Sequence, residues 1–174
     1  GSYITSQFIS DTACFGDTTH FTNTSTPIDS IATIEWYLDT TLLSTDLNPA
    51  IVLPDSGEHQ IRLIQTSNGG CQSDTTLPVY ISPVAQPGFM FHEACTGVEH
   101  QFTDTTKLVE SDTIASYLWQ FGDTNTSNDQ NPVHIYADTG VYNVSLTVFN
   151  SFGCSSSNSE QIHVADTFEA PEII

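Results

Sequence analysis

The chain is almost devoid of basic residues. Only Arg62 and Lys107 carry a formal positive charge, against 21 acidic residues, so the net charge is -19 over 174 residues. Nucleic acids are bound through clustered Lys and Arg side chains, and anionic lipid surfaces through polybasic segments. The scarcity of these residues therefore excludes nucleic acid and an anionic membrane surface as partners.

Long apolar runs and helical periodicity are missing as well. There is no stretch of about 18 apolar residues, so no membrane insertion is expected. No segment sustains a period of 3.6 residues. Strong acidity with many Ser and Thr residues can indicate disorder. The apolar content of 38%, together with regular alternation of apolar and polar residues, favours a folded chain instead.

Motifs of catalytic chemistry are also absent from the sequence. No Ser lies in a G-x-S-x-G setting, and no glycine-rich loop precedes a helix. None of the six His residues forms an H-x-x-x-H or His-Cys cluster of the kind that binds zinc. The carboxylates are many but scattered, so chance pairs are expected among them. We therefore predict that the chain is not an enzyme.

What the sequence does contain is a series of short alternating segments bounded by turn residues. The clearest are 114–121 and 141–148, in which every second residue is apolar. Strands are expected at 3–9, 18–23, 31–38, 58–66 and 74–81, and again at 88–92, 99–104, 114–121, 141–149 and 155–164. Short strands at this spacing predict an all-β chain with sandwich architecture.

The expected strands fall into two copies of one unit. Trp36 and Trp119 are 83 residues apart, and the same offset joins Asn48-Pro49 to Asn131-Pro132. A constant period over such landmarks indicates a tandem repeat. We place one domain at residues 3–82 and the other at 88–165.

A short linker is expected between the two copies. Pro83 and Pro87 bound the segment 83–87, and proline restricts the backbone, so the pair is predicted to form a semi-rigid rod. Residues 166–174 are expected to lead to a further domain.

The four cysteines, Cys14, Cys71, Cys95 and Cys154, lack metal-ligand spacing. An even number at wide spacing favours disulfides and an oxidising compartment. Four thiols in a cytosolic protein are the alternative. Each copy holds one early and one late cysteine, and a sandwich can bring its chain ends to the same pole. We therefore predict that the early and late cysteine of each copy pair with each other, Cys14 with Cys71 and Cys95 with Cys154.

The second copy resembles the PKD (polycystic kidney disease) domain family. The resemblance rests on WQFGD at 119–123, NPVHIY at 131–136 and DTGVYNVSLTV at 138–148. The family usually reads W-D-F-G-D-G, so Gln120 replaces the Asp and Thr124 the second Gly. The first copy, with WYLDT at 36–40, is a degenerate relative. The resemblance implies an immunoglobulin-like β-sandwich that serves as a binding or spacing module on extracellular proteins.

Two further sets of residues are candidates for binding. Relatives of the resembled family sometimes hold calcium in the loop before the Trp strand, and oxygen ligands suit that ion. The candidate calcium ligands are Asp104, Glu110, Asp112 and Asp123, with a solvated turn as the alternative; no other cofactor is expected. Trp36 and Trp119 could stack on sugar rings, but their mid-strand positions favour the core.

These observations predict a non-catalytic extracellular spacer or adhesion module of a large secreted or cell-surface protein. Its expected partners are neighbouring domains of the same chain and a surface polysaccharide or protein, and the chain is expected to be a monomer. The early Cys and late Gly-Cys of each copy make it similar to multidomain surface proteins of Bacteroidetes. The alternative is a carbohydrate- or protein-binding accessory domain of a secreted hydrolase.

Overall fold

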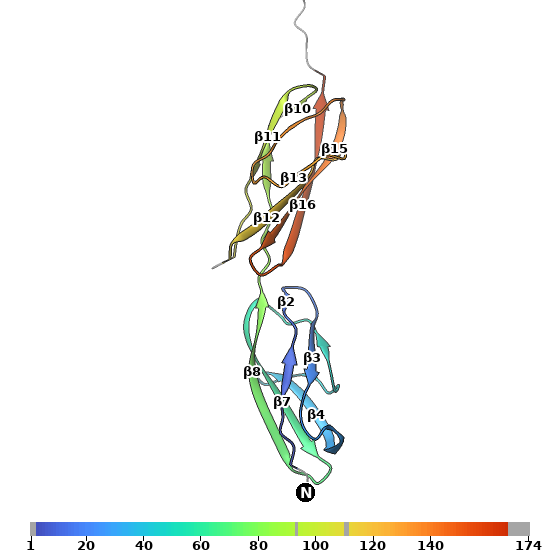
Figure 1. The fold of residues 1–174 in the computed structure, drawn as a ribbon, viewed down its shortest axis with the longest axis vertical. Helices are drawn as coiled ribbons and strands as arrows, with labels where there is room; N and C mark the ends of the chain where they lie inside the picture. Colours follow the sequence, from blue (N-terminus) through green and yellow to red (C-terminus); the bar gives the residue numbers. More distant parts are fainter. Residues whose placement is uncertain (1–2, 93, 110–111, 167–174) are drawn as a thin grey trace, which may run out of the picture. The chain divides into compact units, whose positions relative to one another are not determined.

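The computed structural model of the chain describes residues 3–92, 94–109 and 112–166 (Figure 1). Two compact units meet between Pro83 and Val84. Within the described ranges the regular structure is all strand except for one 3-10 turn at Ile28–Ser30, which confirms the all-β prediction. None of the described segments is a helix long and apolar enough to span a membrane.

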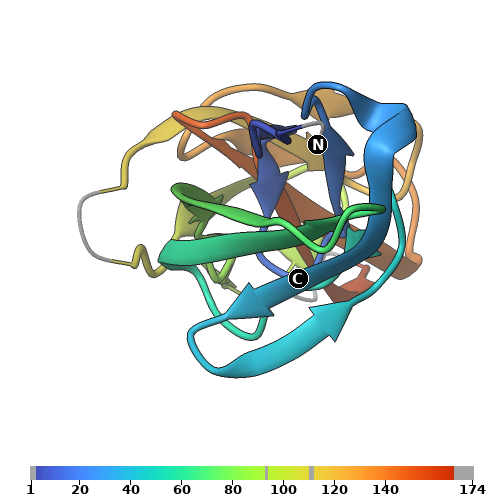
Figure 2. The ribbon, with the colours of Figure 1, turned by 90° about the horizontal axis from the view of Figure 1, so that it is seen from below.

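The first unit is a sandwich of a small sheet and a large sheet. Its strands are β1 (Phe8–Ser10), β2 (Ala13–Cys14), β3 (Thr19–Asn23), β4 (Ile31–Leu38), β5 (Thr41–Ser44), β6 (Ala50–Ile51), β7 (Gly57–Ser67) and β8 (Gln72–Ser82). The sheets have the orders β1-β3-β6 and β2-β8-β7-β4-β5, and their strands are blue to green in Figure 2. Inward side chains such as Phe21, Trp36 and Ile61 fill the space between the sheets.

The second unit repeats this arrangement. Its strands are β9 (Phe89–Phe91), β10 (Ala94–Cys95), β11 (Glu99–Asp104), β12 (Ile114–Gln120), β13 (Thr126–Ser127), β14 (Val133–Ile135), β15 (Gly140–Asn150) and β16 (Ser155–Ala165). The sheets have the orders β14-β11-β9 and β10-β16-β15-β12-β13. Phe102, Trp119 and Leu146 are completely buried between them.

The long hairpins of the two units have the same register. Gly57 pairs with Ile81 in β7–β8, and Gly140 pairs with Val164 in β15–β16. Each of these positions is shifted by 83 residues between the units. The offset found in the sequence is therefore also the offset of strand pairing, which lets each surface position of one unit be compared with its counterpart in the other.

The long strands lie close to their predicted positions, and the short ones do not follow from the sequence pattern. The segment 31–38 is β4, and 58–66 extends by one residue at each end to form β7. Strands of two residues, such as β2 and β10, have no period that could predict them. The prediction of a linker at 83–87 needs correction: Ala85 lies in the core of the second unit and Gln86 pairs with Lys107.

Candidate functional site

The two tryptophans are core residues. Neither Trp36 nor Trp119 exposes any surface. The indole N–H of Trp36 donates to the main-chain oxygen of Asp46, and that of Trp119 to the main-chain oxygen of Asp129, each at 2.9 Å. A buried indole N–H needs such a partner, so each bond anchors the loop ten residues further along the chain. Buried rings cannot stack on a sugar, which removes both residues from the candidate binding surface.

A histidine and a carboxylate pair beside Trp119. His134 Nε2 lies 2.7 Å from Asp123 Oδ2, and the His134 ring stacks on Phe121 with centroids 4.1 Å apart. Burial works to raise the pKa of Asp123, but hydrogen bonds from His134 and Asn125 outweigh it and hold this pKa below its usual 3.8. The imidazole side chain is only 11% exposed. The pair therefore fastens the loop after β12 and offers little surface to a substrate.

Tyr136 closes the same cluster from the other side. Its hydroxyl donates to the main-chain oxygen of Phe121 at 3.0 Å, and its ring packs edge-on against His134. Burial, and after it the negative charge of Asp123, raises the pKa of Tyr136 well above the usual value of 10. The hydroxyl thus stays protonated and remains a donor. The H-x-Y part of the sequence motif is explained by this packing.

The candidate calcium ligands do not converge. Asp112 is buried and accepts a hydrogen bond from Asn150 Nδ2 at 2.8 Å, whereas Asp123 binds His134. The two aspartates flank opposite ends of β12, whose seven residues span about 23 Å. They are therefore too far apart to share one ion.

Asp104 belongs to a third network, in which its carboxylate accepts hydrogen bonds from Thr106 and Gln130. Glu110, the remaining candidate, lies outside the described residues. The described ranges contain no group of three or more His, Cys, Asp or Glu side chains that could hold a metal ion. The three described aspartates therefore cap and bridge loops, each within its own set of protein partners.

The predicted cysteine pairing is wrong in this structure. Cys71 and Cys95 are thiols, whereas Cys14 and Cys154 are disulfide-bonded, so neither predicted pair forms. The reason lies in strand β8. Cys14 pairs with Ser82 at the end of β8, and Cys71 lies before its start. Eleven extended residues separate the two ends by about 35 Å, against the ~5.5 Å between α-carbons that a disulfide needs. Strand β16 separates Cys95 from Cys154 in the same way.

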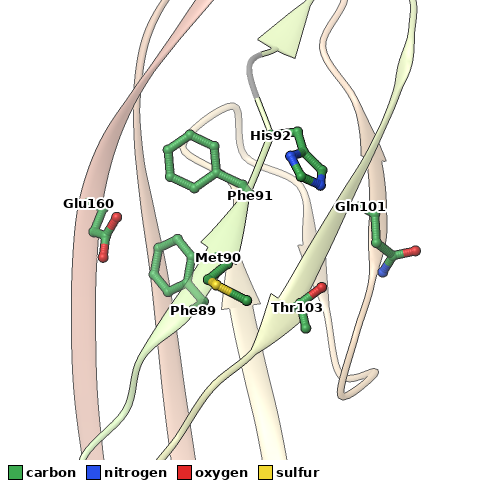
Figure 3. Close-up of a pocket in the computed structure, with 7 residues that line it drawn as sticks. All are labelled: Phe89, Met90, Phe91, His92, Gln101, Thr103 and Glu160. Atoms are coloured by element: carbon green, nitrogen blue, oxygen red, sulfur yellow. The ribbon is translucent and has the colours of Figure 1, made fainter.

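The second unit has an apolar groove along its open side, which we call the side groove (Figure 3). Its volume is about 400 Å³, and it is lined by Phe89, Met90, Phe91, His92, Gln101, Thr103 and Glu160. Figure 3 shows the two phenylalanine rings between β9 and Glu160 of β16. The side chain of Met90 is exposed, at 60%. The side groove has the size and apolar lining of a ligand pocket.

The sequence gave no reason to select the side-groove residues, because a three-residue edge strand such as FMF carries no binding motif. Their common environment depends on which strands form the edges of the two sheets. That arrangement is a property of the folded unit.

Comparison with known proteins gives one family match. The PKD domain model matches residues 80–165. Collagenase ColA of Bacillus cereus is 41% identical over 66 residues, which is 38% of this chain and 7% of that protein. Pre-pro-metalloprotease PrtV of Vibrio cholerae is 41% identical over 51 residues, 29% of this chain and 6% of that protein.

One solved structure similar to this chain is the PKD1 domain of the same Vibrio cholerae metalloprotease. It is 31% identical, and the match covers 46% of this chain and 98% of that domain with a TM-score of 0.40. The chain spans less than a tenth of the length of the curated relatives described above. Residues 80–165, which include β9 to β16, thus match the PKD domain family.

Proposed function

We propose that the chain is a non-catalytic extracellular module that spaces and attaches the domains of a larger secreted or cell-surface protein. The observation that supports this most is the extent of the PKD match. It covers the whole second unit, but in the relatives it covers under a tenth of a much longer protein. A stretch that recurs as a small part of long proteins suits a module that serves its neighbours. Its partners would be those neighbours and a surface polysaccharide or protein.

The second candidate is an accessory binding domain of a secreted hydrolase. It is favoured by the relatives themselves, which are named as collagenases and a metalloprotease. In that case a catalytic domain would occur in the same polypeptide, and the chain would bind the substrate of that domain. The sequence flanking the chain in its parent gene distinguishes the two candidates, since further repeats favour the spacer and adhesion role.

The role is tested with the purified chain on beads. Coated beads are expected to attach under flow to a surface carrying polysaccharide or protein, at a frequency above that of albumin-coated beads. The same chain is expected to release no products from gelatin, casein or soluble polysaccharides. Hydrolysis that persists after a further purification step would contradict the non-catalytic role.

A further inference from the structure

The outer face of the large sheet in the second unit differs in charge from the matching face of the first unit. In the first unit the outward positions of β4, β7 and β8 include Glu35, Glu58, Arg62 and Asp74. In the second unit the outward rows of β12, β15 and β16, all of them described, hold no Asp, Glu, Lys or Arg. A chain with a net charge of -19 thus has an uncharged face at one site.

A groove lies in this uncharged face, and we call it the amide groove. It has a volume of about 260 Å³ and is lined by Gln120, Gly122, Thr124, Asn125, Thr126, Asn143 and Ser145. Strand pairing builds its floor, because Thr126 lies opposite Gln120, and Gln120 lies opposite Ser145. Three carboxamides and three hydroxyls therefore meet at one place, with no large apolar side chain among them.

The amide groups of this groove retain hydrogen-bonding capacity. Gln120 Oε1 accepts a bond from Ser145 Oγ at 3.1 Å, which leaves its NH2 group without a partner among the described residues. The Asn143 side chain likewise makes no hydrogen bond to any described group. Asn125 donates from Nδ2 to Asp123, so its carbonyl oxygen stays available. Each carboxamide supplies both donors and an acceptor.

We infer that the amide groove binds a neutral polysaccharide chain. This inference rests on the proposed role in attachment and names the surface and the ligand class for it. Sugar hydroxyls donate and accept at once, which matches carboxamides and Thr or Ser hydroxyls. Binding an uncharged ligand against uncharged side chains also avoids the large cost of desolvating ions.

The chemistry of the groove disfavours other ligand classes. An anionic polysaccharide would be repelled by the surrounding negative charge. A protein ligand would be expected to insert an apolar or aromatic anchor into an apolar pocket, and the amide groove has no such lining. A small polar groove gives modest affinity, with a dissociation constant on the order of 0.1 to 1 mM.

The test is affinity electrophoresis of the whole chain in gels that contain one soluble polysaccharide each. The neutral probes are hydroxyethyl cellulose, mixed-linkage β-glucan, glucomannan and dextran, and the anionic probe is alginate. At least one neutral probe is expected to retard the chain, and alginate is not. The double variant Gln120→Ala/Asn143→Ala should weaken that retardation at least tenfold.

The matched control is Gln60→Ala, because Gln60 is the counterpart of Asn143 on the charged face of the first unit. It should leave retardation unchanged. Melting temperatures of all variants show that they are folded. Failure of all four neutral probes, or retardation that the double variant preserves, overturns the amide groove as a polysaccharide site. Binding to collagen that the double variant abolishes would also overturn it, in favour of a protein ligand. None of these results bears on the absence of hydrolysis, which tests the non-catalytic role separately.

Discussion

His134 and Asp123 are joined by a 2.7 Å contact between Nε2 and Oδ2 that ties strand β14 to the loop after β12. The contact is mostly shielded from water, with the Asp123 side chain 18% exposed. Its stabilising effect should therefore depend on the ionisation of Asp123.

Asp123→Asn should lower the free energy of unfolding by about 1 to 3 kcal/mol at pH 6, because a charge-assisted hydrogen bond is lost. The folded pKa of Asp123 lies below 3.8. The contribution is thus complete above the pKa of the unfolded state and disappears as the pH falls through the lower folded value. Urea unfolding from pH 6 to pH 2 measures the difference between wild type and variant, which should shrink below about pH 4. Asp138→Asn, at an exposed turn of the same unit, should show no such trend.

Thr124→Gly should stabilise the second unit. Thr124 has a φ of +77°, a left-handed conformation that costs a β-branched residue about 1 to 2 kcal/mol. Glycine removes that strain but makes the unfolded chain more flexible, so a net gain of about 0.5 to 1 kcal/mol is expected. Thermal unfolding measures it. Thr126→Gly, in the neighbouring strand β13, is the control and should destabilise. A loss of stability in both variants would contradict the strain argument.

Cysteine labelling should divide the four sulfur atoms into two classes. Iodoacetamide applied to the folded, unreduced protein should modify Cys71 and Cys95, because both are thiols with some exposure. Cys14 and Cys154 should react only after reduction, because they are disulfide-bonded. Peptide mass spectrometry measures the labelling. A cross-linked peptide that contains Cys71 or Cys95 would refute this assignment.

Trp119→Phe should destabilise the second unit by about 2 to 3 kcal/mol, because it leaves a cavity and deprives the Asp129 carbonyl of its donor. Trp36→Phe should do the same in the first unit. Neither change should alter retardation by a neutral polysaccharide at a temperature where the variant is folded. Loss of retardation in a folded variant would show that a tryptophan contacts the sugar.

Calcium should have no effect on the melting temperature of the second unit. Asp104, Asp112 and Asp123 are already bound within three separate sets of protein groups. Differential scanning calorimetry in EDTA and in millimolar calcium tests this expectation, because an ion that binds only the folded state raises the melting temperature. An upward shift that saturates with calcium would show a site that these three residues do not explain.

The fold could be predicted to a large extent, because long half-buried strands leave a period of two in the sequence. The segment from Ile114 to Gln120 was expected and is β12. The repeat offset added the equivalence of the two units, which neither copy shows alone.

The candidate sites could not be predicted in the same way, because they depend on cross-strand register and on the two ends of each strand. The cysteine error shows this: Cys14 and Cys71 belong to one copy, but β8 separates them by its full length. The amide groove combines Gln120 and Asn143, which lie on neighbouring strands and share no sequence signal. Thr124 did offer one, since it occupies a position where the resembled family has glycine.

The parallel pairing of first and last strands has a mechanical consequence within each unit. In the first unit Ala13 pairs with Ile81 and Cys14 with Ser82, so the chain leaves beside a strand that runs in the same direction. In the second unit Ala94 and Cys95 pair with Val164 and Ala165 in the same sense. Tension applied to the two ends of such a unit would load these hydrogen bonds in shear, all at once, and would not peel them apart one by one. A unit built this way would resist pulling forces best along the direction in which its neighbours are attached.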